Sequence, residues 1–282
     1  MKSKKRAILV MFCVLCLMTI LPLQALAAAK ASIKLDTTST TIKVGNSLTL
    51  NATVTGKSSK VTWTSSNKKI ATVSSTGKVK AVKAGNVTIT AKANGKTAKC
   101  KLTVKNKSYK ELYKAFLAKE KVKVNNQTIN IGYFYILNIN KKGVPELIIT
   151  DKYSGALVTY YVYSIIDGKV KCIGSCTAKG LSNSSFYYSK KYKGLYVGGW
   201  INFVGGAWES LYCMNSTGKK LSSKYWAKSQ LNPKGYWTGT SSENCKKVTK
   251  AKCSTYSKKY FKNLTRYEMH ANTAANRANY VK

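Results

Sequence analysis

Residues 61–91 alternate apolar and polar side chains in short runs, and this pattern constrains the fold more than any other feature of the chain. The segment reads VTWTSSNKKIATVSSTGKVKAVKAGNVTITA, with Gly77 and Gly85 between its runs. A period of two with turn residues at short intervals is typical of antiparallel strands that have one buried and one solvated face. We therefore expect a β-sandwich in the N-terminal part of the chain.

The expected sandwich covers residues 30–105, which we take as one domain. Extended segments are assigned near residues 31–36, 39–43, 47–55, 60–65, 70–74, 78–83, 86–93 and 96–104. Asn94-Gly95, between two alternating runs, is a strong signal for a tight β-hairpin. The side chains expected to point inward are Ile33, Leu35, Leu48, Leu50, Val61, Trp63, Ile70, Val73, Val79, Ile89, Cys100, Leu102 and Val104.

The combined pattern resembles the bacterial immunoglobulin-like domain of group 2, a module repeated in intimin- and invasin-type surface proteins. The matching residues are 63–67, 70–73, 77–81, Gly85 and 88–91. The resemblance implies an extracellular spacer or cell-adhesion module without catalysis, and it implies that Cys100 is a packed thiol. For Trp63 the core of the sandwich is the commoner role, and a platform for a sugar ring is the alternative.

The first 28 residues are typical of a cleaved signal peptide. A basic start precedes an apolar run at residues 7–21 and a small-x-small cleavage signature at Ala25-Leu26-Ala27. The apolar run is shorter than the roughly 20 residues that span a bilayer. We expect an extracellular protein with no membrane span after cleavage, secreted or associated non-covalently with the cell envelope.

Lysine dominates a strongly positive charge balance. The chain has 49 Lys and Arg residues against 9 Asp and Glu residues, a formal net charge of +40, and its arginines are Arg6, Arg266 and Arg277. Such a field attracts polyanions, and salt weakens it. Reading base edges favours arginine, so we expect no sequence-specific nucleic-acid binding. The expected partners are an anionic wall polymer, a glycan or a mucin; the alternative is that lysine only keeps solvated strands soluble.

Residues 108–282 are expected to form an α+β domain with an antiparallel sheet and flanking helices. Ser108-x-x-Glu111 is a capping box that opens an amphipathic helix to about Lys119. Asp167-Gly168 is a hairpin turn between two of the strand-like runs that follow. A short helix within residues 272–280 closes the domain. With its initial helix, Tyr- and Gly-rich sheet and closing segment, this part loosely resembles uncharacterised clostridial-type exported domains, which carry no assigned activity.

The turn that contains Asn138, Asn140, Gly143 and Glu146 resembles the aspartate-rich loop D-x-D/N-x-D-G-x-x-E-L. Calcium loops need several anionic oxygens because the ion is hard and divalent. Here the two asparagines are neutral, Lys142 takes a carboxylate position, and only Glu146 keeps its charge. We expect the shape of the turn to survive without a metal site.

Six cysteines follow the signal: Cys100 in the first domain, and in the second Cys172, Cys176, Cys213, Cys245 and Cys253. An exported protein can oxidise them. The spacing allows local bridges between Cys172 and Cys176 and between Cys245 and Cys253, and buried thiols are the alternative. Zinc is not expected, because the sequence has no Cys-x-x-Cys pair.

The sequence contains no catalytic motif, so we expect no catalytic residues and no cofactor. His270 is the only histidine, and Ser or Cys nucleophiles usually need a neighbouring base. Turns and helix caps account for several of the carboxylates. A hydrolase that uses two of Glu146, Asp151 and Glu209, roughly 5 to 10 Å apart across a cleft, is the alternative to a non-catalytic protein.

Aromatic residues concentrate between residues 192 and 237, interrupted by pairs of glycines. Exposed aromatic rings beside small residues can stack on sugars, which makes Trp200, Trp208 and Trp237 candidate ligand-binding residues; the alternative is that the rings fill the core. The function expected is a non-catalytic spacer or adhesive module joined to a domain that binds glycan or anionic polymer. A purely structural domain that binds another protein through a sheet edge is a further alternative.

Overall fold

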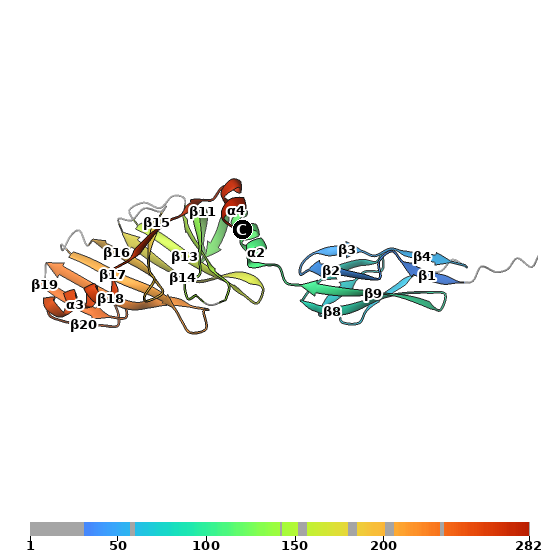
Figure 1. Cartoon of the computed structure of the whole chain (residues 1–282), viewed down its shortest axis with the longest axis horizontal. Coiled ribbons are helices and arrows are strands. Elements are labelled where there is room, and N and C mark those ends of the chain that lie inside the picture. The colour runs from blue at the N-terminus through green and yellow to red at the C-terminus, as the bar shows by residue number, and fades with distance from the viewer. Residues whose placement is uncertain are drawn as a thin grey trace, which may run out of the picture. The chain divides into compact units, whose positions relative to one another are not determined.

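The structure, a computed structural model, describes residues 31–56, 60–141, 143–151, 157–179, 185–200, 206–231 and 234–281. The chain divides into two compact units between Asn106 and Lys107 (Figure 1). The signal peptide expected at residues 1–28 lies outside the described residues. Across the described ranges, no helix has the length and apolar character needed to cross a membrane.

The N-terminal domain is a β-sandwich, as the alternating pattern predicts. Its described strands are β1 (Ser32–Leu35), β2 (Ser39–Lys43), β3 (Ser47–Thr49), β4 (Ala52–Thr55), β5 (Thr62–Ser65), β6 (Ala71–Val73), β7 (Lys78–Ala81), β8 (Gly85–Ala93) and β9 (Lys96–Lys105). One sheet takes the order β2-β9-β8-β5, another takes the order β3-β7-β6, and β1 pairs with β4. The expected segment 47–55 is divided into β3 and β4, because its two halves pair with strands of different sheets.

The core of the sandwich contains the inward-facing residues that the sequence predicts. Ile89 and Cys100 are fully buried in its main hydrophobic cluster. Trp63 is half-buried and packs on this cluster and on a second one around Ile33. Its indole also lies against Gly77, which adopts a positive φ of 79° in the turn before β7. Trp63 therefore joins the two clusters of the core, and Cys100 is a packed thiol.

The C-terminal domain contains short helices and two antiparallel sheets among its described residues. The helices are α2 (Tyr109–Leu117), α3 (Lys250–Tyr260) and α4 (Ala274–Tyr280). The first sheet takes the order β10-β11-β12-β13-β14, with β22 added to β11. Its strands are β10 (Lys121–Val124), β11 (Gln127–Leu137), β12 (Glu146–Asp151), β13 (Leu157–Ile166), β14 (Lys169–Lys179) and β22 (His270–Ala271).

The second sheet takes the order β20-β19-β18-β17-β16-β15-β21. Its strands are β15 (Ser185–Ser189), β16 (Gly194–Trp200), β17 (Gly206–Met214), β18 (Leu221–Leu231), β19 (Lys234–Gly239), β20 (Cys245–Lys247) and β21 (Thr265–Glu268). Because β21 belongs to this sheet and β22 to the first, the end of the chain passes from one sheet to the other.

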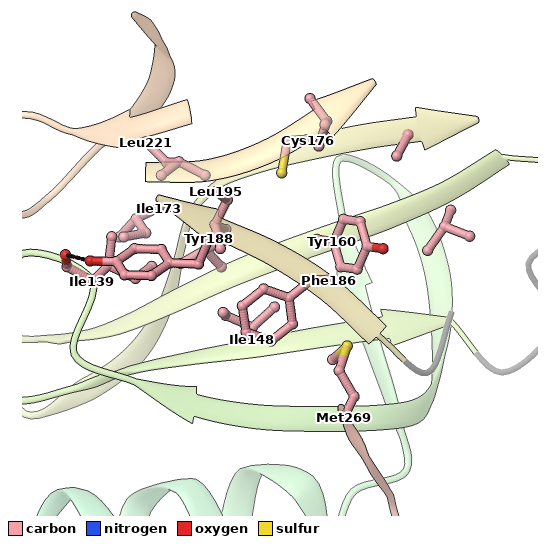
Figure 2. Close-up of a cluster of buried hydrophobic side chains, with 14 residues drawn as sticks. Ile139, Ile148, Tyr160, Ile173, Cys176, Phe186, Tyr188, Leu195, Leu221 and Met269 are labelled. Atoms are coloured by element: carbon pink, nitrogen blue, oxygen red, sulfur yellow. Dashed lines mark hydrogen bonds between the residues drawn. The ribbon is translucent and has the colours of Figure 1, made fainter. Parts of the chain in front are cut away.

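The two sheets pack face to face through one large hydrophobic cluster (Figure 2). The first sheet contributes Ile148 and Tyr160, and the second contributes Phe186 and Tyr188. Ile139 enters the cluster from the loop between β11 and β12, and the Tyr188 hydroxyl donates a hydrogen bond of 2.7 Å to its carbonyl oxygen. Large apolar side chains of this kind each contribute about 1.5–3 kcal/mol on burial. The cluster therefore holds the two sheets together.

Helices cover the outer faces of the two sheets. α2 buries Tyr113 and Leu117 against the first sheet. Its capping box is present as predicted: the Ser108 hydroxyl accepts from the backbone N–H of Glu111, and the Glu111 carboxylate accepts from the Ser108 N–H. α3 buries Cys253 against the second sheet. The layers of this domain therefore run helix, sheet, sheet, helix.

Two features of this domain differ from the sequence-based expectation, namely the second sheet and α3. Strands on both sides of the division alternate in the same way, so the pattern does not indicate that β14 ends one sheet and β15 begins the next. α3 is rich in lysine and buries only Cys253, so it lacks the apolar stripe by which helices are recognised. The expected closing helix is present as α4.

Replacing Gly77 with Ala tests the packing of Trp63. A Cβ at this position would collide with the Leu50 carbonyl oxygen and lie 2.9 Å from the Trp63 indole. Gly95 also has a positive φ, but a Cβ there would meet nothing within 4 Å. We expect Gly95→Ala to cost only the conformational strain of about 1–2 kcal/mol, and Gly77→Ala to cost about 1–3 kcal/mol more. Thermal unfolding of both variants measures the difference; equal costs would contradict this packing.

Candidate functional site

A groove lies where the inner face of the second sheet continues past the edge of the first. β14 is the edge strand of the first sheet, and residues from β17, β18 and the turn after β19 face it. The groove has a volume of about 480 Å³. Its lining residues are Ser175, Cys176, Thr177, Trp208, Tyr212, Ser223, Trp226, Lys228, Ser241 and Ser242.

The close approach of β14 and β18 at one point sets the end of the groove. A Cβ on Gly174 would lie 2.8 Å from both the Cβ and the carbonyl oxygen of Leu221. These two strands therefore touch at the first residue of β18. Thr177 and Lys228, which are farther from this contact along β14 and β18, both line the groove.

Strand alternation directs the aromatic side chains of β17 into the groove. Trp208 and Tyr212 pack on the cluster between the sheets, whereas Leu211 packs on the opposite face beneath α3. The pairing of β17 with β18 shifts by one residue between Leu211 and Tyr212. Trp226, which is 8% exposed, also lines the groove, so its floor is largely apolar.

Trp208, Lys228, Trp237 and Lys247 form a row across β17, β18, β19 and β20, which we call the Trp–Lys row. Trp208 pairs with Lys228, Lys228 with Trp237, and Trp237 with Lys247. Directly paired residues project from the same face of a sheet. The Lys228 Nζ lies 5.2 Å from the centroid of the Trp237 ring, a cation–π contact. Indole and ammonium groups therefore alternate along the row.

Two glycines of β19 are two residues away from Trp237, one on each side. Gly235 is on the same face as Trp237, two residues earlier in β19, and a Cβ there would collide with the indole. The Trp237 ring therefore lies over Gly235. On the other side of Trp237, Gly239 pairs with Trp226. The close neighbour of each glycine belongs to the protein itself: the Trp237 ring at Gly235, and the backbone of Asn244 and Cys245 at Gly239.

Polar residues border the groove on two sides. Ser175 and Thr177 come from β14, and Ser241 and Ser242 come from the turn after β19. The Thr177 side chain is on the opposite face of β14 from the buried Cys176, and its hydroxyl forms a 2.9 Å hydrogen bond with the hydroxyl of Thr159. Ser223, which pairs with Tyr212 on the inner face of the second sheet, supplies a hydroxyl to the lining. An apolar floor with a few convergent polar groups is typical of small-ligand sites.

Two of the three predicted tryptophans thus lie together, because Trp208 and Trp237 belong to the Trp–Lys row. Trp200 pairs with Ala207, one position away from the Gly199–Trp208 pair, and its side chain lies outside the described part of the structure. Lys228 was not among the candidates. The available signal is that Trp226 and Lys228 are two residues apart on one strand, which places them on the same face.

The turn from Asn138 to Glu146 has a structural role in the described loop. The Glu146 carboxylate is buried and accepts a 2.8 Å hydrogen bond from the backbone N–H of Ile139. The Tyr113 hydroxyl donates a 2.8 Å hydrogen bond to the carbonyl oxygen of Pro145. Glu146 is therefore already engaged in holding Ile139 between the sheets, and the neutral Asn138 and Asn140 add no charge for a divalent cation.

The structure does not bring Glu146, Asp151 and Glu209 together. Glu146 and Asp151 are five residues apart on β12, which corresponds to about 17 Å along an extended strand. Glu209 is on β17 of the second sheet, where it accepts a 3.3 Å hydrogen bond from the Tyr196 hydroxyl. Tyr196 packs on the cluster beneath α3, so Glu209 is on the outer face of that sheet and Glu146 is between the sheets.

The six cysteines of the described ranges are all free thiols, so neither of the local bridges that the spacing allows is formed. Cys172 is exposed, whereas Cys176 is buried between the sheets. Cys245 donates a hydrogen bond to the carbonyl oxygen of Ser242, and Cys253 is buried beneath α3. The paired candidates are therefore in separate environments. Burial also raises the pKa of the Cys176 thiol.

Comparison with known families identifies the N-terminal domain. The family model of the bacterial Ig-like domain (group 2) matches residues 29–104, which include the described sandwich. The N-terminal domain is therefore a bacterial Ig-like domain, as its residues predict. The looser resemblance expected for the C-terminal domain has no support from these comparisons and stays a prediction. No curated protein matches the chain.

Among solved structures, the chain is similar to parts of the surface layer protein SbsC. A structure of SbsC domains 1–6 is 16% identical, covers 77% of this chain and 25% of its own, and has a TM-score of 0.25. A structure of SbsC domains 4–9 is 15% identical, covers 77% of this chain and 30% of its own, and has the same TM-score. This chain thus spans less than a third of either SbsC structure, and TM-scores this low carry no argument about fold or function.

The buried Glu146 carboxyl predicts a pH-dependent stability. Desolvation raises its pKa from 4.5 to about 7, against the opposing effect of the Ile139 hydrogen bond. Because the folded state binds this proton more tightly than the unfolded chain does, the proton on Glu146 stabilises the fold. This stabilisation is complete below about pH 4.5 and is lost as the pH rises to about 7. Glu146→Gln keeps an acceptor oxygen and removes the titration. We expect the variant to melt above the wild type at pH 8 and close to it at pH 4.5.

Glu243→Gln is the control for this prediction, because Glu243 is exposed in the turn after β19 and its removal relieves no buried charge. Melting temperatures of the three proteins across this pH range provide the measurement. A Glu146→Gln variant that is less stable than the wild type at pH 8 would show that the charged carboxylate is needed to hold the loop.

Proposed function

We propose that the chain is an extracellular, non-catalytic protein of the cell envelope whose C-terminal domain binds a glycan in the groove beside β14. The bacterial Ig-like domain serves as a spacer or adhesive module that presents the binding domain. The observation that carries the proposal is the placement of Trp208 and Trp237 on one face, beside a groove with a largely apolar floor.

The chemistry of the groove supports a carbohydrate ligand. Sugar rings present apolar, polarised C–H faces that stack on aromatic rings, and their hydroxyls exchange hydrogen bonds with side chains. Trp208 and Tyr212 supply rings at the floor, and Ser223 and Lys228, their partners on β18, supply polar groups on the same face. Trp208 and Trp237 are both partly exposed, so a ligand can contact their rings without a rearrangement of the core.

The spacer role is supported by the N-terminal domain and by the export-type start of the chain. Residues 29–104 match the bacterial Ig-like family, and their apolar side chains are used in the core of the sandwich. The separation of Glu146, Asp151 and Glu209 favours a binding role over the hydrolase alternative, since a glycosidase needs two carboxylates across one cleft.

Trp208→Ala tests glycan binding in the groove. We expect the full-length variant to lose about tenfold in affinity for a retained glycan, equivalent to about 1.4 kcal/mol, because the ring under the sugar is removed. Affinity electrophoresis or calorimetry against soluble wall polysaccharides and mucin glycans measures the effect. Trp208→Phe, which keeps an aromatic face, is expected to recover part of the affinity.

Tyr280→Ala is the matched control, because Tyr280 is 51% exposed and belongs to α4, away from the groove. It is expected to leave the affinity unchanged. Equal affinity of the wild type and a folded Trp208→Ala variant, or failure of the wild type to retain any glycan of the panel, would contradict the proposal.

A further inference from the structure

We propose that the ligand of the groove is an acidic glycan, whose sugar rings stack on Trp208 and Trp237 and whose anionic groups pair with Lys228 and Lys247. This inference rests on the proposed glycan binding and adds the charge of the ligand and its direction across the strands. It follows from the order of the Trp–Lys row, in which each indole is next to an ammonium group on the same face.

The spacing of the row suits a polymer that carries its charge at intervals. Neighbouring strands are about 4.8 Å apart, so Trp208 and Trp237 are about 10 Å apart across the sheet, with Lys228 between them. Lys247 extends the row by one more strand. A chain lying across the strands can therefore meet an indole, an ammonium, an indole and a second ammonium in turn.

The cation at the centre of the row is partly enclosed. Lys228 lines the groove and is only partly exposed, and its ammonium group lies over the Trp237 ring. An ion pair made in such an enclosed site is screened less by solvent and salt than a pair on an open surface. Lys228 therefore contributes more to selecting an anionic ligand than an isolated surface lysine does.

In the described ranges, neither Lys228 nor Lys247 forms an ion pair with a carboxylate. The ion pairs found there join Lys171 to Asp167 and Arg266 to Glu268. Glu209, the acid next to Trp208 in the sequence, is on the opposite face of the sheet and accepts a hydrogen bond from Tyr196. Glu243 is exposed in the turn whose Ser241 and Ser242 line the groove, and among the described residues it forms no ion pair with Lys228 or Lys247. The inner face of the row thus presents cations to the ligand.

The indoles distinguish an acidic glycan from a simple polyanion. A polyphosphate chain can pair with lysine ammonium groups, but it has no apolar ring face to cover Trp208 or Trp237. Lysine acts as a point charge and not as a planar fork, so carboxylate and sulfate groups on the sugar both satisfy Lys228. The shared chemistry is a sugar ring that carries a fixed negative charge.

The test compares four polymers on the full-length protein: polygalacturonate, dextran sulfate, neutral dextran and polyphosphate. We expect one or both acidic glycans to bind at least tenfold more tightly than dextran and polyphosphate, with the better of the two identifying the anion. We expect Lys228→Gln and Lys247→Gln to lower that affinity several-fold and to flatten its dependence on salt, and Trp237→Ala to lower it about tenfold.

Lys246→Gln is the matched control. Lys246 is next to Lys247 on β20 but pairs with Thr238, which places it on the opposite face. It carries the same charge, so any effect of net charge alone appears equally in Lys246→Gln and Lys247→Gln. Equal losses in these two variants would overturn the inference.

Two further results separate failure of this inference from failure of the proposed function. If dextran binds as tightly as the acidic glycans and Trp208→Ala still weakens binding, the groove binds glycans without regard to charge, and only the acidic ligand is overturned. If polyphosphate binds as tightly as the acidic glycans and neither Trp208→Ala nor Trp237→Ala has an effect, stacking plays no part and both proposals are overturned.

Discussion

The packing of the two sheets of the C-terminal domain determines where the groove lies. The cluster that includes Ile148, Tyr160 and Phe186 holds the sheets together, and the contact between Gly174 and Leu221 brings β14 against the start of β18. Beyond that contact the first sheet has ended at its edge strand, while the second continues through β18, β19 and β20. The groove is a consequence of this offset, since no described strand of the first sheet covers the inner face of the second sheet there.

The same alternation of side chains therefore has two uses along one sheet. Where the first sheet covers it, the inner face presents Leu195 and Val197, which are buried. Past the edge of β14, equivalent positions hold Trp208, Lys228 and Trp237, which are partly exposed. On the outer face α3 covers Leu211 and Ala227, whereas no helix among the described residues covers the inner face of this half of the sheet.

The N-terminal domain could be predicted in detail because each of its strands carries its own signal. Alternation placed Ile89 and Cys100 in the core, and the glycine before β7 marked the turn on which Trp63 packs.

The C-terminal domain was harder to predict, because strand pairing joins residues far apart in the sequence. Its strands and first helix were recognisable, but no local pattern shows that β14 is an edge or that β15 begins another sheet. The sequence places Lys228 on the same face as Trp226, but only the strand register shows that Lys228 lies between Trp208 and Trp237. Glu146 matches an acidic position of the calcium-loop pattern, yet in the structure its carboxylate accepts a hydrogen bond from the backbone of Ile139. The sequence pattern alone does not indicate this contact.

The most direct test of the account is the response of the individual indole N–H resonances of the full-length protein to an acidic oligosaccharide. The chain has five tryptophans, so single Trp→Phe variants assign each signal in a ¹H–¹⁵N spectrum. We predict that the resonances of Trp208 and Trp237 shift together and saturate at the same ligand concentration, while that of Trp63 in the sandwich core stays in place. Saturable binding that leaves the Trp208 and Trp237 resonances unmoved would contradict the assignment of the groove as the ligand site.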